Sequence, residues 1–128
     1  MPAFIFQTVQ FSVIPQLSNI GNGGALNIVI SPLSFASNGE RDIHISFKSM
    51  VYMPTKDTSS LELTAKDASN LELTLNDIAL KTACSKKLYE ETYDLVVDFQ
   101  DIEGRAYKQI LRMEKAHCRP QPVTAVSV

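Results

Sequence analysis

Apolar and polar residues alternate along several stretches of the chain, and a period of two is the pattern of a half-buried β-strand. The stretch 43–51 places Ile43, Ile45, Phe47 and Val51 on one face and His44, Ser46 and Lys48 on the other. The stretch 93–100 places Tyr93, Leu95, Val97 and Phe99 on one face and Asp94, Asp98 and Gln100 on the other, with Val96 as the exception. Near the N-terminus, Val9, Phe11 and Val13 alternate with Gln10 and Ser12. The stretch 83–91, ACSKKLYEE, is the best candidate for a helical turn, so the pattern predicts an all-β chain with at most one short helical turn.

The segment 93–113 predicts a β-hairpin of defined register. Residues 102–104 form a loop that ends in Gly104, and this loop type requires a glycine at its last, left-handed position. The register places on one face the pairs Phe99–Tyr107, Leu95–Leu111 and Tyr93–Met113. On the other face it pairs Asp98 with Lys108 and Asp94 with Arg112. Each matching cross-strand pair adds a few tenths to about 1 kcal/mol, so the pairs favour this register together.

An internal echo predicts a second hairpin: SSLELTAKD at 59–67 returns as SNLELTLND at 69–77. The period is too short for a solenoid repeat. With the loop at 67–69, the register pairs Lys66 with Asn70, Ala65 with Leu71, Leu63 with Leu73 and Leu61 with Leu75. Apolar and polar residues then sort onto separate faces, as register selection requires. The loop lacks a glycine, so two successive edge strands or chance remain as alternatives.

Turn residues separate the predicted strands. The stretch 37–40, SNGE, is typical of a turn, and Pro15, Pro32 and Pro54 lie between apolar runs. Counting gives about seven or eight short strands at the spacing of a β-sandwich. The chain has 128 residues, which suits one domain. We expect an antiparallel sandwich over residues 1–119 and a C-terminal tail or last strand over 120–128.

Composition excludes several classes of protein. The net charge is −2 and the longest basic run is Lys86-Lys87, so the basic patch of a nucleic-acid-binding protein is missing and no nucleic-acid partner is expected. Every apolar run is far shorter than the roughly 18 residues of a membrane span. The first residues have no basic start, and Gln7 and Gln10 interrupt them, unlike a signal peptide. Two locations stay open: the cytoplasm, or the outside of a membrane to which a segment beyond this chain anchors it.

The stretch 16–31, QLSNIGNGGALNIVIS, raises the question of a phosphate-binding loop. A dinucleotide-binding loop needs G-x-G-x-x-G before a helix; Gly21 and Gly23 fit, but Leu26 stands at the third position and a strand-like run follows. A P-loop needs a G-K-[ST] sequence, which this stretch lacks. We therefore interpret Gly21, Gly23 and Gly24 as a bend between strands, with Asn19 and Asn22 bonding to the turn backbone.

Four acidic residues, Asp94, Asp98, Asp101 and Glu103, raise the possibility of a calcium site or a carboxylate pair. Their spacing does not match a calcium-binding loop, and the hairpin register gives two of them cationic partners. We expect a solvated, salt-paired face, with no metal and no cofactor.

The histidines and cysteines do not match a zinc site, because the two histidines, His44 and His117, cannot supply four ligands alone, and Cys84 and Cys118 lack the CxxC spacing. A catalytic pair such as Cys118 with His44 has no supporting motif. In the hairpin register position 118 falls opposite position 88, which brings Cys118 to the same open end as Cys84. A disulfide in an oxidising compartment and two thiols in the cytoplasm are both open.

Tyr52, Tyr89, Tyr93 and Tyr107 suggest an aromatic platform for sugar. Tyr93 and Tyr107 lie on the predicted core face, and the chain has no Trp, so packing is the simpler role for them.

Two local patterns resemble a known family. LSNIGNGGALNIVI resembles the NxGxGxAxNI signature of immunoglobulin-like β-sandwich domains in poorly characterised bacterial proteins, although Gly24 replaces a proline often found there. DFQDIEGRAYKQ resembles the YxDxxGRxY hairpin near the end of the same domains. Phe99 stands where an aromatic residue is common, and the matching positions are Asp101, Gly104, Arg105 and Tyr107. The resemblance implies a fold, and it also implies a soluble domain that follows membrane helices in a longer protein.

These observations predict a non-catalytic structural or protein-interaction domain with a protein partner still to be identified. The first alternative is a glycan-binding module. The second is a small enzyme that uses Cys118 or the acidic face.

Overall fold

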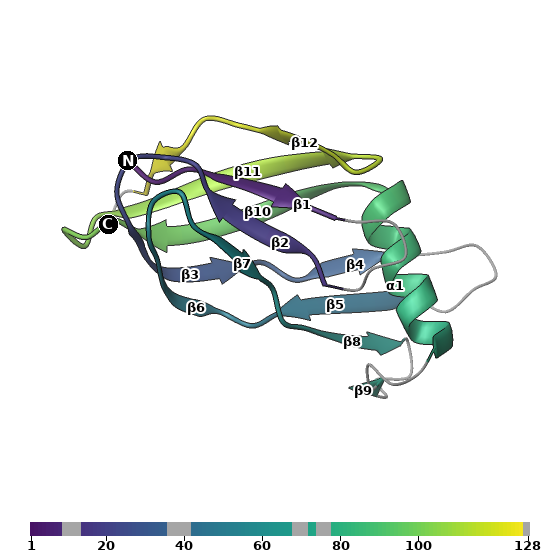
Figure 1. Cartoon of the computed structure of the whole chain (residues 1–128). Coiled ribbons are helices and arrows are strands. Elements are labelled where there is room, and N and C mark those ends of the chain that lie inside the picture. The colour runs from purple at the N-terminus through teal and green to yellow at the C-terminus, as the bar shows by residue number, and fades with distance from the viewer. Residues whose placement is uncertain (9–13, 36–41, 68–71, 74–77, 127–128) are drawn as a thin grey trace.

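The computed structural model describes residues 1–8, 14–35, 42–67, 72–73 and 78–126. In these ranges the chain forms strands β1 to β13, in antiparallel sheets, and the helix α1. The predicted all-β class is confirmed. Figure 1 shows a short front sheet over a longer back layer, with α1 closing one end of the molecule. Of the predicted features, the turn at 37–40 and the alternation at 9–13 lie outside the described residues.

The front sheet has the strand order β1-β2-β7, with β1 at Phe4–Gln7, β2 at Gln16–Asn19 and β7 at Thr58–Ser60. Phe4 and Phe6 alternate with polar or half-buried neighbours and are fully buried. The ring of Phe4 meets that of Phe99 edge to face at 5.0 Å, which joins the two layers. The buried amide of Gln109 adds a polar link, because its Oε1 accepts a hydrogen bond from Phe4 N at 2.7 Å.

The back layer contains two sheets. The first has the order β12-β11-β10-β3-β6, with β13 also paired to β11, and the second the order β4-β5-β8-β9. The strands of the first are β3 at Ala25–Ile30, β6 at Met50–Met53, β10 at Thr92–Gln100, β11 at Ala106–Glu114, β12 at His117–Pro120 and β13 at Thr124–Ala125. Those of the second are β4 at Leu33–Phe35, β5 at Ile43–Phe47, β8 at Leu63–Asp67 and β9 at Glu72–Leu73.

Bends in long strands explain why more strands are present than the sequence predicted. Residues 31–32 separate β3 from β4, and Pro32 there cannot donate to a ladder. Residues 48–49 separate β5 from β6, the two strands that pair with β4 and β3. Since β3 pairs with β6 and β4 with β5, the four segments are one long bent hairpin.

The segment β7–β8 changes layers. β7 pairs with β2 in the front sheet, whereas β8 pairs with β5 in the back layer. The change occurs at residues 61–62, where Lys48 N donates to Glu62 O at 2.9 Å.

The β10–β11 hairpin has the predicted register. Phe99 pairs with Tyr107, Leu95 with Leu111, Tyr93 with Met113, Asp98 with Lys108 and Asp94 with Arg112. The exceptional Val96 pairs with Ile110, and both are half-buried on the outer face.

The β8–β9 hairpin forms with a register two residues away from the predicted one. Ala65 pairs with Leu73, not Leu71, and Lys66 pairs with Glu72, not Asn70. Registers that differ by two residues have the same alternation of faces, so the apolar pattern alone could not choose between them. Leu75 lies outside the described residues.

The remaining predictions are met in part. Helix α1 spans Ile78–Glu90, which includes the predicted position but is longer than one turn. Val51 was expected in the core set, yet it is 78% exposed, because the bend at residues 48–49 interrupts the alternation. Residues 115–116 turn the chain back, so that β12 lies along β11. The segment after residue 119 supplies the end of β12 and the strand β13, so no structural break occurs there.

Candidate functional site

The glycine stretch forms a bend organised by a buried amide. Asn19 has no exposed surface, and its Nδ2 donates to Gly23 O at 3.0 Å and to Met53 O at 3.3 Å. Its Oδ1 accepts from Gly21 N at 3.2 Å and from Ala3 N at 3.5 Å. The expected role of Asn19 is confirmed, whereas Asn22 contributes its backbone N–H, which donates to Met1 O at 3.0 Å.

Each glycine of this bend has its own structural reason. A Cβ at Gly21 would lie 2.3 Å from Met1 O, so the N-terminal backbone leaves no space for a side chain. Gly23 has a φ of 91°, which L-residues rarely adopt. A Cβ at Gly24 would lie 2.6 Å from Cε2 of Tyr52, whose ring covers this position. The three glycines are therefore required by the backbone conformation and packing of the bend.

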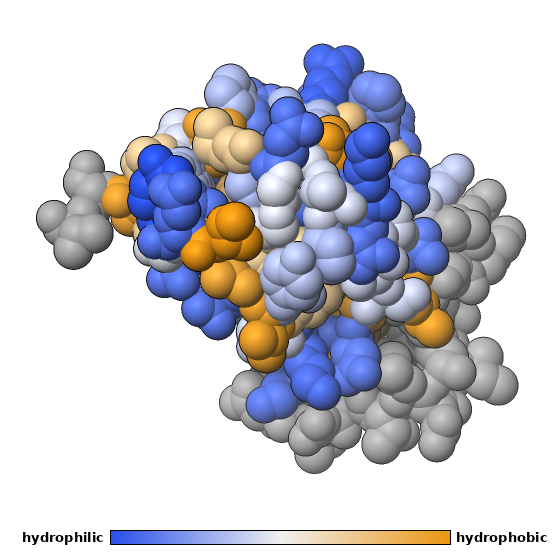
Figure 2. Space-filling model, turned by 60° about the vertical axis from the view of Figure 1, so that its left-hand side comes forward, coloured by the Kyte–Doolittle hydropathy of each residue, from blue (hydrophilic) through white to orange (hydrophobic). Residues whose placement is uncertain are grey.

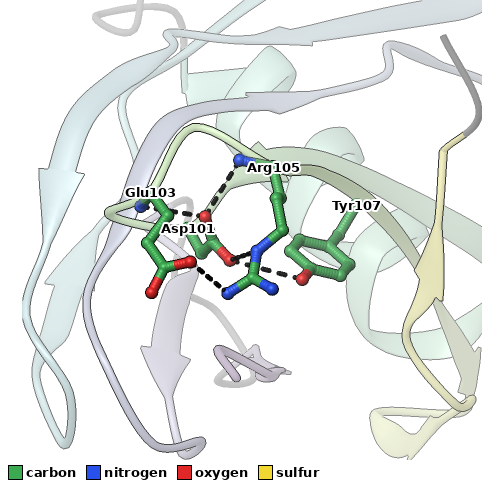
Figure 3. Close-up of polar contacts among 4 residues, drawn as sticks. All are labelled: Asp101, Glu103, Arg105 and Tyr107. Atoms are coloured by element: carbon green, nitrogen blue, oxygen red, sulfur yellow. Dashed lines mark hydrogen bonds and ion pairs between the residues drawn. The ribbon is translucent and has the colours of Figure 1, made fainter.

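The β10–β11 loop is organised by a buried carboxylate (Figure 3). Asp101 Oδ1 accepts hydrogen bonds from Arg105 N at 2.9 Å and from Glu103 N at 3.0 Å. Its Oδ2 accepts from Arg105 Nε at 2.9 Å and from Tyr107 Oη at 3.3 Å. Gly104 has a φ of 85°, as the predicted loop type requires.

The charge of Asp101 is stabilised by these donors. Burial alone would raise the pKa of its carboxyl, but hydrogen bonds from the backbone and guanidinium of Arg105, together with the Arg105 charge, outweigh burial and lower the pKa. The ionised form therefore holds the loop at neutral pH.

All four acidic residues of the predicted acidic group have cationic partners. Asp94 lies 3.1 Å from Nε of Arg112, and Asp98 lies 4.0 Å from Nζ of Lys108. Glu103 and Asp101 both contact Arg105. In the part of the chain that the structure describes, no group of three or more His, Cys, Asp or Glu side chains is placed to hold a metal ion.

The cysteines are not bonded. Cys84 lies buried on α1, and Cys118 lies half-buried on β12, and both are free thiols. The expected position of Cys118 opposite residue 88 was wrong, because strand β11 ends at Glu114 and the chain reverses at residues 115–116. Cys118 pairs with Met113 instead. Burial raises the pKa of Cys84 to about 11, and burial also raises the pKa of Cys118, although a hydrogen bond from Phe6 N opposes the shift. A raised pKa disfavours the thiolate, which is the nucleophilic form of cysteine, at neutral pH.

His44 lies on β5, whereas His117 directly precedes Cys118 on β12. Nδ1 of His44 lies 2.8 Å from Oγ of Ser34, its neighbour across the β4–β5 pair, and both are exposed. The residue opposite His44 on β8 is Lys66, which offers no carboxylate to orient the ring. His117 is exposed at the start of β12.

Two tyrosines of the supposed sugar platform are packing residues. Tyr93 lies edge to face with Phe35 at 5.4 Å, and its Oη donates to Leu88 O at 2.7 Å. Tyr107 stacks on Phe99 at 5.8 Å. Tyr52 is exposed, and it covers Gly24.

Exposed apolar side chains gather at one end of the molecule. This end, here named the loop end, comprises the bend 20–24, the turn 54–57, the loop 101–105 and both ends of the described chain. Lys56 N donates to Asn19 O and Val126 N to Ala106 O, which ties these segments together. The exposed large apolar residues of the loop end are Met1, Ile20, Ile102 and Val126, and the exposed Tyr52 of β6 lies just before the turn 54–57. Figure 2 shows hydrophobic residues in a band on this side of the molecule, bordered by hydrophilic ones.

Each of the two exposed isoleucines directly follows the buried residue that organises its bend, here named the anchor. Ile20 succeeds Asn19 and is 55% exposed, and Ile102 succeeds Asp101 and is 70% exposed. The sequence analysis missed this surface, although an isoleucine within a polar three-residue loop was a visible signal.

Two hollows lie where β7–β8 changes layers. The larger, about 570 Å³, is lined mainly by residues of β5, β7 and β8. The smaller, about 200 Å³, lies between the start of β6 and the end of β7 and is here named the β6–β7 fork; its lining residues are Lys48, Ser49, Met50, Ser60, Leu61 and Glu62. The exposed ion pair Lys48–Glu62, at 3.5 Å, borders both hollows.

Comparison with known proteins gives no match: no protein-family model, no curated protein and no solved structure is similar to this chain. Among the described residues no helix is long and apolar enough to cross a membrane.

Proposed function

We propose that this chain is a non-catalytic protein-interaction domain that binds its partner through the loop end. The observation that carries the proposal is the placement of Ile20 and Ile102 directly after the buried anchors Asn19 and Asp101. Each anchor fixes its bend by four hydrogen bonds, so the backbone that carries the exposed isoleucine is held in place.

An apolar side chain on a fixed backbone is suited to binding. Moving an exposed isoleucine into a protein interface contributes roughly 1.5–3 kcal/mol when burial is complete. Flexible loops lose part of this gain when they become ordered on binding, whereas a loop fixed during folding does not. The loop end therefore combines apolar area with a low entropic cost of association.

The described polar side chains support a binding role over a catalytic one. The acidic residues of the β10–β11 hairpin are ion-paired, and the thiols of Cys84 and Cys118 have raised pKa values. The pair Ser34–His44 lies exposed on a sheet face.

We further propose that the fold is of the immunoglobulin-like type and that the chain is the soluble part of a membrane-anchored protein. The change of layer between β7 and β8 and the two-layer arrangement support the first point. The second rests on the sequence resemblance, and the location stays a prediction.

Capture of partners with immobilised variants tests the proposed function. The wild-type chain and the double variant Ile20→Glu/Ile102→Glu are exposed to an extract of the native cells, and retained proteins are quantified by mass spectrometry. We expect a set of proteins that the wild type retains and the double variant loses. Lys86→Gln, on the exposed face of α1, serves as a control for a change of charge and is expected to retain the set. Equal retention by wild type and double variant would contradict the proposal.

A further inference from the structure

The strand β6 forms one edge of the back layer. It pairs with β3 on one side, and no strand of the described ranges pairs with its other side. A strand in this position directs a row of backbone N–H and C=O groups away from the sheet. Met53 O already accepts from Nδ2 of Asn19 at 3.3 Å, so the groups left for a partner belong to the rest of the strand. Such groups are satisfied by water or by another extended chain, and they therefore select the conformation of a binding partner.

Within its four residues, the edge strand β6 carries neither a charged residue nor a proline, two of the features that protect edge strands. Folded proteins place charged residues or proline on exposed edges. β12, the opposite edge, carries Arg119 and Pro120. β6 instead has the sequence MVYM, with Val51 78% exposed and Tyr52 53% exposed. The two edges of the same sheet thus differ in chemistry, and the unprotected one is apolar.

The β6–β7 fork continues this edge. It begins at Met50, the first residue of β6, and its opposite wall is formed by the end of β7 and by Leu61. A strand that paired with β6 and extended past Met50 would reach the fork. Recognition by strand addition combines such backbone pairing with pockets for individual side chains.

We propose that β6 accepts an extended peptide segment of the partner protein as an added strand, with one polar side chain of that segment seated in the β6–β7 fork, whose lining is mostly polar or charged. The inference deepens the proposed function and rests on it, because it names the form of the partner. The size of the edge selects a peptide over a second copy of this chain. Four residues span only about 13 Å. An edge this short offers little contact area, whereas a stable dimer buries roughly 800 Å² on each partner.

Peptide selection on the intact chain tests this inference. A phage-displayed library of random linear peptides is selected on the wild-type chain, and the enriched peptides are synthesised and titrated by calorimetry. NMR spectra of the isotopically labelled chain with added peptide locate the binding site, and we expect amide chemical-shift changes along Met50–Met53 and Ser60–Glu62. N-methylation of the peptide at alternate residues is expected to weaken binding by about tenfold or more, and methylation at the intervening residues is expected to have little effect. This readout leaves the protein unchanged and is specific for strand pairing.

A matched pair of protein variants completes the test. Val51→Lys places a charge on the edge and is expected to weaken the peptide about tenfold. Val29→Lys places the same charge on an exposed valine of β3, which is an inner strand, and is expected to leave binding unchanged. Thermal midpoints of both variants show whether either has lost its fold.

The outcomes separate this inference from the proposed function. Ile20→Glu/Ile102→Glu is expected to bind the selected peptides like the wild type. Peptides that map to the loop end, or that ignore N-methylation, would overturn strand addition and leave the proposed function standing. If no peptide is enriched more strongly on the wild-type chain than on the Val51→Lys variant, strand addition is overturned as well. A dimer seen by sedimentation and dissociated by Val51→Lys would assign the edge to a second copy and reject the peptide.

Discussion

Two bends meet at the loop end, and they are held by opposite kinds of polar group. The bend 20–24 is organised by the neutral amide of Asn19, which both donates and accepts. The loop 101–105 is organised by the charged carboxylate of Asp101, which only accepts. Both present an isoleucine at the next position. One surface is thus supported by one bend that is insensitive to pH and one that depends on ionisation.

The glycines of the two bends also differ in role. Gly21 is required by space, because the backbone of residues 1–3 occupies the position of a side chain. Gly104 is required by conformation, because its φ is 85° while a Cβ at this position would meet nothing within 4 Å. A residue can therefore be a glycine for a tertiary reason or for a local one, and substitution distinguishes the two.

The largest effect is expected for Asn19→Ala. The variant leaves backbone groups of Ala3, Gly21, Gly23 and Met53 without their side-chain partner. Because unsatisfied buried groups cost about 1–3 kcal/mol each, we expect a loss of about 3–4 kcal/mol in the free energy of unfolding, measured by urea denaturation. A loss below about 1 kcal/mol would show that water replaces the amide and that Asn19 is not the anchor of the bend.

Gly21→Ala is expected to cost about 2–3 kcal/mol, because the added methyl group overlaps backbone atoms of Met1 and Ala3. Denaturation gives the free energy, and amide hydrogen exchange locates the disturbance in β1. Gly23→Ala is the matched control, since its Cβ meets nothing within 4 Å and the cost is conformational alone. Equal losses for the two variants would refute the steric role of Gly21.

Gly104→Ala is expected to cost about 1 kcal/mol, the usual penalty of a left-handed conformation for an L-residue. The expected loss is smaller than that of Gly21→Ala because the space around Gly104 is open. Thermal unfolding followed by circular dichroism measures it. A loss as large as that of Gly21→Ala would remove the distinction between the two bends.

Asp101→Asn gives the smallest expected effect and carries a pH signature. The pKa of Asp101 is lowered in the folded state, so its stabilisation is present above the unfolded pKa, about 4, and is lost as the pH falls through the folded pKa. We expect the variant to lower the thermal midpoint by roughly 2–5 °C at pH 7, with the difference shrinking as the pH falls below about 4.

Asp94→Asn is the control for this pH dependence, because that carboxylate is exposed beside Arg112. Its midpoint is expected to stay close to that of the wild type across the same pH range. A difference for Asp101→Asn that is constant with pH would argue that shape, and not charge, holds the loop.

The β10–β11 hairpin was predictable because its determinants are close in sequence. Gly104 lies at the required position, and the pairs Asp98–Lys108 and Leu95–Leu111 fix the register from both faces. The next turn was not predictable. Lys115 and Ala116 have φ values of 48° and 67°, which favour glycine or asparagine, and neither residue signals a turn. The pairing of β12 with β11 holds this turn, so the error in placing Cys118 has a tertiary cause.

The sequence by itself determined the all-β class, the β10–β11 register and the role of the glycine stretch as a bend, because alternation, turn residues and local pairs act over short distances. Only the tertiary structure decided which residues form the loop end and which edge of the back sheet is left unprotected. The alternation that places Val51 on the core face is broken by a bend at residues 48–49, and that bend arises where β7–β8 leaves one layer for the other. Exposure of an apolar residue is a property of the whole packing arrangement, and no local pattern contains it.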